Sequence, residues 1–361
     1  MKNTSEALFK TVSLRPYTQL CTSVHQRMYY IIGLLLLQVL LLLITKSWSS
    51  LIIIGATVLA AFAAEASELL QLERKPLNWQ RALRNGLLIG LLLPNTYSPL
   101  IAFFVTLAVV LVCTWLLGGE VQSWVNPPAL AIAVCWLIGM RLFPAYPLSI
   151  DVLQARNATQ QLMQSGVFSK LAADSQLTAV LNKTVYNRLG ATVPEGYLSL
   201  LWDSQAAIPA FRFNALTLLS SIVLIVGDVI KPLIPALYIL VYLALVRFIA
   251  PLLYGGAVGQ GDMLLALLTS GTLFTTLFLL QWNGTTPLTR AGKSCYGIVA
   301  GILAFLIVGC GASPTGSIFT ILVLNVISPL IQAVESLRYD RYVRTVLLPK
   351  SDALLKDGIH A

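Results

Sequence analysis

The sequence predicts an all-α membrane protein with about ten transmembrane helices. Of its 361 residues, 57% are hydrophobic and only 11% are charged, whereas soluble domains carry about 25% charged residues. Apolar stretches close to the roughly 20 residues needed to cross a bilayer recur from Tyr29 to Ala333. Because the backbone at that depth must satisfy its own hydrogen bonds, these stretches are expected to be helical.

Hydropathy and the placement of Gly and Pro divide the chain into successive spans, which we expect at 29–45, 51–70, 84–94, 99–117, 127–142, 213–230, 233–253, 263–280, 294–311 and 316–333. The third and fifth spans are short and bounded by Gly and Pro. We therefore expect them to be partly broken or buried helices. The first span is expected to be retained, because the segment before it does not have the pattern of a cleavable signal peptide.

The positive charges predict the orientation. Most Lys and Arg residues outside the longest loop lie on the same side as the N-terminus, which the positive-inside rule places in the cytoplasm. We expect a multi-pass inner-membrane protein with a cytoplasmic N-terminal segment, a first membrane half, an extracytoplasmic loop, a second membrane half and a cytoplasmic tail, at 1–27, 28–142, 143–209, 210–334 and 335–361. This orientation explains the net charge of +9, and no basic face with interleaved aromatic residues indicates nucleic-acid binding.

Five spans in each half would give the halves opposite topologies, as in carriers built from inverted repeats. The third span of each half carries an expected interruption, at 85–95 and at 269–272, and this pairing favours a ligand or ion site at mid-membrane depth. Glu65 and Asp228 are candidates for an ion path, because charges within a membrane are costly; a structural or interfacial position is the alternative. The cysteines form no C-x-x-C and histidine is scarce, so no metal site is expected.

Three polar, glycine-rich clusters separate the later spans of the two halves, at 118–128, 283–290 and 309–316. Each is either a tight turn or an irregular backbone segment that lines a cavity.

In their order along the chain, these clusters resemble segments of the family that contains the D subunit of the Rnf complex and the B subunit of the sodium-pumping NADH:quinone reductase. The segment that begins at Gly118-Gly119 and ends at Asn126-Pro127 with Ala129 is similar to the family's G-G-x-x-Q-N-x-F-N-P-A turn. Further stretches that resemble the family are 56–65, 270–297 and 314–331.

The resemblance implies that FMN is attached through its phosphate to a threonine in the outer loop, and Thr192 is the matching position. Gly190 and Ala191 keep the small residues before it, whereas Tyr186 and Leu189 replace the family's acidic residue and serine. The resemblance also implies further cofactor-binding positions and a second, noncovalent flavin; the candidates are Gly118, Gly119, Asn126 and Thr272.

The resulting hypothesis is a flavin-carrying membrane subunit of an Rnf-type ion-translocating complex, which couples electron transfer between ferredoxin and NAD to movement of Na⁺ or H⁺. The chain has no G-x-G-x-x-G phosphate loop and no ferredoxin-like cysteine run, so other membrane and peripheral subunits are expected to supply those sites. A flavin transferase and the lipid bilayer are the other expected partners, and the chain alone is expected to be inactive. Two alternatives stay open: a secondary transporter of a small solute or ion, and a structural subunit that has lost its flavin.

Overall fold

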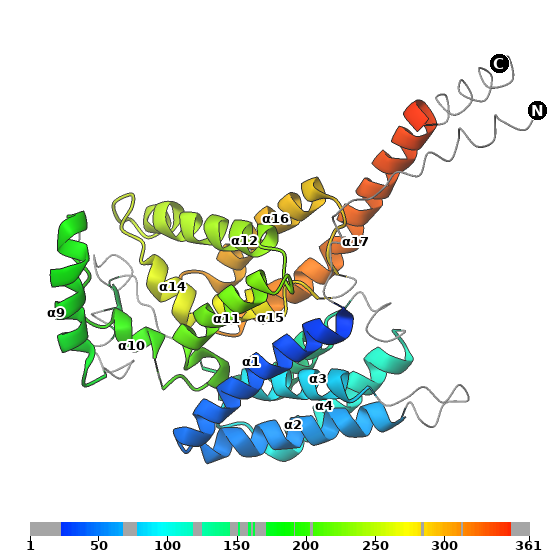
Figure 1. Ribbon diagram of the computed structural model, residues 1–361, viewed down its shortest axis with the longest axis horizontal. Coiled ribbons are helices and arrows are strands. Elements are labelled where there is room, and N and C mark those ends of the chain that lie inside the picture. Colours follow the sequence, from blue (N-terminus) through cyan, green and yellow to red (C-terminus); the bar gives the residue numbers. More distant parts are fainter. Residues whose placement is uncertain are drawn as a thin grey trace, which may run out of the picture.

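The computed structural model of the chain (Figure 1) describes residues 23–67, 78–117, 125–144, 151, 158–159, 162, 171–190, 192–202, 205–282, 285–311 and 313–347. This part of the chain is helical and contains no strand, which confirms the all-α fold. Among the described helices, five are long and apolar enough to cross a membrane, at Val24–Ile44, Trp48–Ala66, Leu233–Leu253, Arg290–Val308 and Gly316–Thr345. Shorter apolar helices accompany them, and the protein is therefore a polytopic membrane protein.

Each expected span corresponds to a helix or a helix pair. The helices of the first half are α1 (Val24–Ile44), α2 (Trp48–Ala66), α3 (Trp79–Leu92), α4 (Pro99–Trp115) and α6 (Pro127–Ile138). Those of the second half are α11 (Asn214–Val226), α12 (Leu233–Ala244), α13 (Ala250–Leu253), α14 (Met263–Thr269), α15 (Thr272–Phe278), α16 (Arg290–Val308) and α17 (Gly316–Tyr342). The α12 helix continues through a π-helical stretch, Leu245–Ile249, into α13. The described residues of the connection between the halves include the short helices α9 (Asp174–Thr184) and α10 (Tyr197–Leu201).

The two halves repeat one packing pattern. In the first half α2 packs on α4, α4 on α6 and α1 on α3, and in the second α12 packs on α16, α16 on α17 and α11 on α15. Matching helices also meet where the halves join, since α1 contacts α11 and α6 contacts α17. The Trp136 and Phe319 rings lie 5.1 Å apart across the second of these contacts. This arrangement is the one expected of a duplicated five-helix unit.

Close helix packing depends on glycine in both halves. A Cβ atom on Gly86 of α3 would lie 2.5 Å from the Val58 Cα atom of α2, and the Thr57 hydroxyl donates to the Gly86 carbonyl at 2.9 Å. In the second half, a Cβ atom on Gly301 of α16 would lie 2.9 Å from the Tyr238 carbonyl oxygen of α12. Small residues let helix backbones approach closely in a membrane, where dispersion and hydrogen bonds drive association.

The expected interruption of the third span is wrong for the first half. The α3 helix runs unbroken through Gly86 to Leu92, and almost all of its residues are buried, as expected for this span. Its glycines provide a flat surface for α2 instead of breaking the helix. Only the corresponding span of the second half is interrupted, between α14 and α15.

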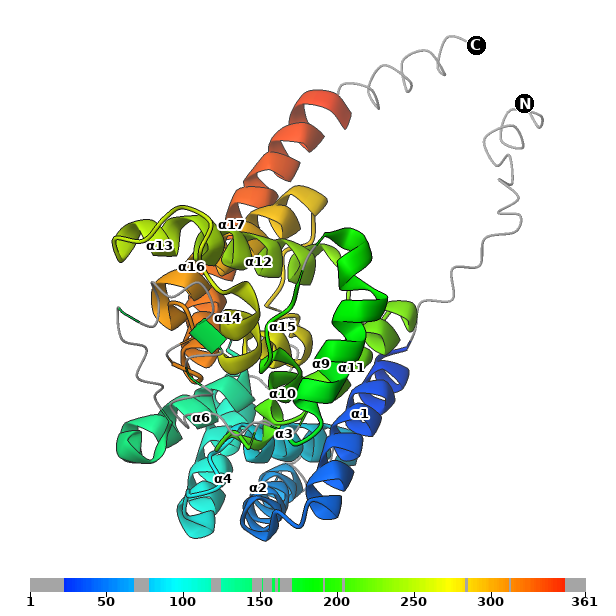
Figure 2. The same cartoon turned by 90° about the vertical axis from the view of Figure 1, so that its left-hand side faces the viewer.

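The two ends of the molecule differ in character (Figure 1). The α9 and α10 helices lie at one end, and the start of α1 and the end of α17 lie at the other. Figure 2, which looks onto the first end, shows α9 and α10 in front of the membrane helices. We call the α9–α10 side the outer end, in keeping with the orientation that the charges predict.

Candidate functional site

Asp174 is the first residue of α9, and its buried side chain connects α9 to the start of α10. Its carboxylate accepts hydrogen bonds from the Thr178 hydroxyl at 2.8 Å, the Gly196 N–H at 3.3 Å and the Ser199 N–H at 3.1 Å, and also from the Ser199 hydroxyl. Burial by itself would raise the pKa of Asp174, but these donors outweigh it and hold the pKa below its ordinary value. The carboxylate therefore ties α9 to α10 while it is ionised.

Thr192 lies between α9 and α10, and its side chain is exposed. The next residue is fixed by the Asn182 side chain of α9, which accepts from the Val193 N–H and donates to the Val193 carbonyl, both at 2.9 Å. On the other side, Gly190 adopts a φ of +66°, and a Cβ atom there would meet no atom within 4 Å. Thr192 is thus an exposed residue next to the hydrogen-bonded Val193, and the space at Gly190 is open.

Two other motif positions have a defined place. Tyr186 to Leu189 form a 3-10 turn, which ends at Gly190 in the left-handed conformation that glycine adopts without strain. The Tyr186 side chain is half-buried and stands where the family pattern has an acidic residue. Ala191 lies outside the described residues, as do Gly118 and Gly119.

A polar cleft of about 510 Å³ opens at the same end, with Tyr197, Arg247 and Asp262 in its wall. Asp262 caps α14 by accepting from the Leu265 N–H at 3.0 Å, and it accepts from the Tyr197 hydroxyl at 2.7 Å. Burial and the negative charge of Asp262 both raise the pKa of Tyr197 above its ordinary value. Arg247 brings a positive charge and donates to the Gly261 carbonyl at 2.9 Å.

The break between α14 and α15 contains Thr272, one of the predicted site residues. Gly271 has a φ of +69°, and the Phe211 ring lies so close that a Cβ atom would stand 2.1 Å from it. The Thr272 hydroxyl is buried; it accepts from the Ser270 hydroxyl at 2.9 Å and donates to the Leu267 carbonyl at 3.3 Å. The Asn214 side chain donates to the Leu268 carbonyl at 3.0 Å. Side chains of this chain therefore satisfy polar groups at the break.

Asn126, another predicted site residue, is fully buried. Its side-chain oxygen, Oδ1, accepts from the Ala129 N–H at 3.3 Å and thereby caps α6. Its side-chain nitrogen, Nδ2, donates to the Leu279 carbonyl at 3.1 Å. The residue links the first half to the end of α15. These contacts give Asn126 a structural role in joining the halves.

The two ion-path candidates occupy different environments. Glu65 is buried and forms a two-pronged ion pair with Arg81, with Nε–Oε2 and Nη2–Oε1 distances of 2.9 and 2.5 Å. Asp228 lies near the end of the expected span 213–230, just beyond the last residue of α11, and its carboxylate is 2.5 Å from the Lys231 Nζ atom. The hydrogen bond from Lys231 lowers the pKa of this exposed carboxyl. Neither observation tests ion passage, but the Arg81 pairing favours a structural role for Glu65.

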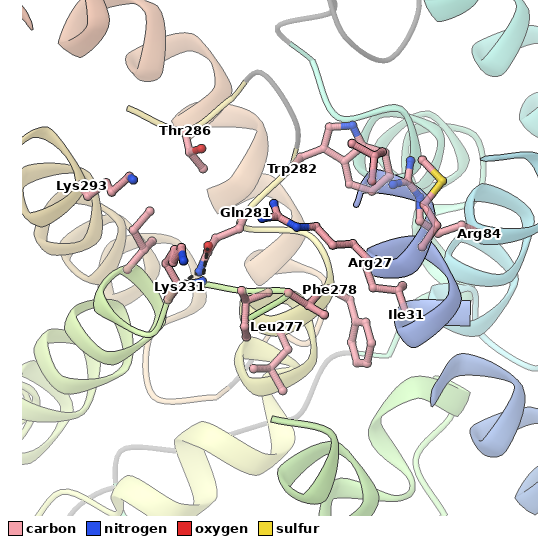
Figure 3. A pocket seen from close by; sticks show the side chains of 15 residues that line it. Arg27, Ile31, Arg84, Lys231, Leu277, Phe278, Gln281, Trp282, Thr286 and Lys293 are labelled. Carbon is pink, nitrogen blue, oxygen red and sulfur yellow. Dashed lines mark hydrogen bonds between the residues drawn. The ribbon is translucent and has the colours of Figure 1, made fainter. Parts of the chain in front are cut away.

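Sequence reasoning missed a basic pocket at the end opposite α9 and α10 (Figure 3). Four cationic residues line it, namely Arg27, Arg84, Lys231 and Lys293. They come from four separate segments of the chain, and the positive-inside rule explains each of them only as an orientation signal. The clustering of positive charge in the loops on one side was the available signal, but the sequence does not show that these four side chains converge.

The fold and these sites define the class: an all-α, multi-pass membrane protein whose two halves repeat one packing pattern, with a polar segment around α9 and α10. The chain matches the NQR2, RnfD, RnfE family over residues 11–339, and it belongs to that family.

Curated relatives are named as the D subunit of an ion-translocating oxidoreductase complex. The chain is 26% identical over 306 residues to the one from Citrobacter koseri and 26% identical over 303 residues to the one from Escherichia fergusonii. It is 24% identical over 317 residues to the one from Cronobacter sakazakii. In each case the match covers 79% of this chain and 85% of the relative.

Proposed function

We propose that the chain is the flavin-carrying membrane subunit of an Rnf-type complex, in which electron transfer between ferredoxin and NAD drives Na⁺ or H⁺ across the inner membrane. Membership of the family and the names of the relatives support its role as a subunit of an ion-translocating oxidoreductase. Other subunits of that complex are then its partners. The chain itself is expected to be inactive when isolated.

The observation that carries the flavin proposal is the presentation of Thr192. Its hydroxyl is exposed, Asn182 fixes the adjoining Val193, and the space beside Gly190 is open. A phosphoester needs such an accessible hydroxyl, and a flavin transferase needs room to bring a phosphate against it. These features fit an attachment point although Tyr186 and Leu189 depart from the family pattern.

The remainder of the proposed flavin site is the outer cleft. Tyr197 follows Thr192 by five positions and belongs to the cleft wall, together with Arg247 and Asp262. Arg247 would place a positive charge near an anionic flavin, and Tyr197 would offer a ring and a hydroxyl. When bound, FMN supplies one-electron chemistry, while the chain determines where the flavin stands.

In-gel fluorescence tests the proposal. The chain is expressed with its cognate flavin transferase, denatured and separated on a gel, next to Thr192→Val and the control Thr184→Val. Thr184 also carries an exposed hydroxyl in this segment, but it donates to the Val180 carbonyl within α9. We expect fluorescence in the parent and the control and none in Thr192→Val. A dark parent band with an active transferase would favour the structural subunit that has lost its flavin.

The transporter alternative depended on interrupted helices in both halves. Of the two third spans, only the α14–α15 span is interrupted among the described residues, and side chains satisfy its polar groups from within the protein. The fold therefore supports the electron-carrier proposal better than the transporter one.

A further inference from the structure

We propose that the basic pocket at the end opposite α9 and α10 binds the phosphate group of an anionic ligand, and that a phospholipid headgroup is the source its apolar wall favours. The inference does not depend on flavin attachment, because the two sites lie at opposite ends of the molecule. The pocket has a volume of about 320 Å³.

The charges of the pocket converge from separate elements (Figure 3). Arg27 belongs to α1, Arg84 to α3 and Lys293 to α16, and Lys231 stands just before α12. In Figure 3 the Arg27 side chain reaches across the pocket and its guanidinium lies close to Gln281. None of the described residues that line the pocket is acidic.

Carboxylates also lie near these cations: Asp228 contacts Lys231 at 2.5 Å, and Glu335 accepts from the Thr289 N–H at the start of α16 at 3.1 Å. The Gln281 side chain fixes the same lysine by accepting from its N–H at 3.0 Å and donating to its carbonyl at 2.7 Å. The described lining has an excess of positive charge, since it carries four cationic side chains and no carboxylate, and this favours an anion in the pocket.

Helix dipoles increase this excess. Arg27 and Lys293 lie in the first turns of α1 and α16, and Lys231 stands two residues before α12. Cations at helix N-termini are unfavourable, because the free N–H groups there already carry partial positive charge. The Glu335 carboxylate already lies at the α16 end, where it accepts from the Thr289 N–H, so an anion in the pocket would mainly compensate the ends of α1 and α12.

The lining includes two buried residues with polar side-chain groups, Arg84 and Trp282, which are 4% and 3% exposed. The guanidinium carbon of Arg84 lies 3.9 Å from the centre of the Trp282 ring, in a cation–π contact. The Trp282 Nε1 atom, a buried donor, has no hydrogen-bond partner in the part of the chain that the structure describes. A bound acceptor reached directly or through water would satisfy it.

The remaining wall is apolar, which distinguishes a lipid from a small soluble ion. Val24, Met28, Ile31, Ile234, Leu277 and Phe278 contribute to it. Basic pockets between transmembrane helices on the cytoplasmic side are typical sites for anionic headgroups. Phosphate at the cations with acyl chains along the apolar wall would satisfy both parts.

Native mass spectrometry of the purified full chain tests the site with added phosphatidylglycerol and phosphatidylcholine. The test variant is Arg27→Gln combined with Lys293→Gln, neither of which is deeply buried. Lys183→Gln is the control, because Lys183 is an exposed cation of α9 at the other end. We expect the parent and control to prefer phosphatidylglycerol, and each removed charge to weaken its binding about fivefold.

A competition arm identifies the source of the phosphate. Inorganic phosphate could displace the lipid and protect the parent, but not the double variant, against heat. That result would support phosphate binding in the pocket and identify a soluble phosphate, instead of a lipid, as the ligand. Equal binding of both lipids by parent and double variant, with no effect of inorganic phosphate, would overturn the proposal. Flavin fluorescence at Thr192 should be the same in all three chains, so failure here is distinct from failure of the flavin proposal.

Discussion

Replacing Gly86 with alanine should loosen the contact between α2 and α3. The added Cβ atom would lie 2.5 Å from the Val58 Cα atom, well inside the optimal carbon–carbon separation of about 3.5–4.0 Å. Since the obstacle is backbone, relief requires the helices to separate, which also strains the 2.9 Å hydrogen bond from Thr57 to the Gly86 carbonyl. Overpacking costs about 1–3 kcal/mol and an interhelical hydrogen bond contributes about 0.6 kcal/mol, so we expect a loss of about 2 kcal/mol.

The free energy of unfolding, measured by titrating the purified protein with SDS, checks this expectation. Gly55→Ala is the matched control, because Gly55 lies on α2 and its added Cβ atom would meet nothing within 4 Å. A loss of about 2 kcal/mol lowers the folded-to-unfolded ratio roughly 30-fold, whereas the control should be unchanged or slightly stabilised. If Gly86→Ala proves as stable as Gly55→Ala, the glycine-dependent packing is refuted.

Three further predictions concern the ion pair, the outer segment and the topology. Glu65→Gln should destabilise the chain by about 3–5 kcal/mol, because it leaves the Arg81 charge without its carboxylate; Arg81→Gln added to it should restore part of the loss in an SDS titration. Asp174 has a lowered pKa, so its contribution is present above the pKa of an unfolded Asp, about 3.9, and is lost as pH falls through the lower folded value. Proteolysis of the outer segment should therefore accelerate in acid, and Asp174→Asn should be cleaved faster at neutral pH and show less acid dependence; equal cleavage of parent and variant at neutral pH would contradict this. In intact cells, a membrane-impermeant thiol reagent should label Lys183→Cys but not Thr345→Cys, and labelling of both from outside would exclude the proposed orientation.

Much of the fold could be predicted because membrane helices have a strong signal. Length and hydropathy located the described helices of both halves, and the polar residues around Gly271 correctly indicated the break before α15. The same reasoning failed at Gly86, because glycine within a membrane helix can serve packing as readily as interruption. Only the close backbone of α2 shows that Gly86 serves helix packing and does not interrupt α3.

The candidate sites were less predictable. The resemblance directed attention to Thr192, but the support from Asn182 and Asp174 depends on how the loop folds back on α9. The basic pocket was missed because its charges are far apart in the sequence and each has an ordinary explanation as an orientation signal. A sequence gives the side of the membrane for such residues but not their convergence.

The intact mass of the chain, after expression with its flavin transferase and removal of noncovalent ligands, tests the central proposal most directly. The account predicts that the parent gains the mass of FMN less one water, that the gain maps to the peptide containing Thr192, and that Thr192→Val has the mass of its bare sequence. A parent whose mass equals the bare sequence, although the transferase modifies another substrate in the same cells, would contradict it.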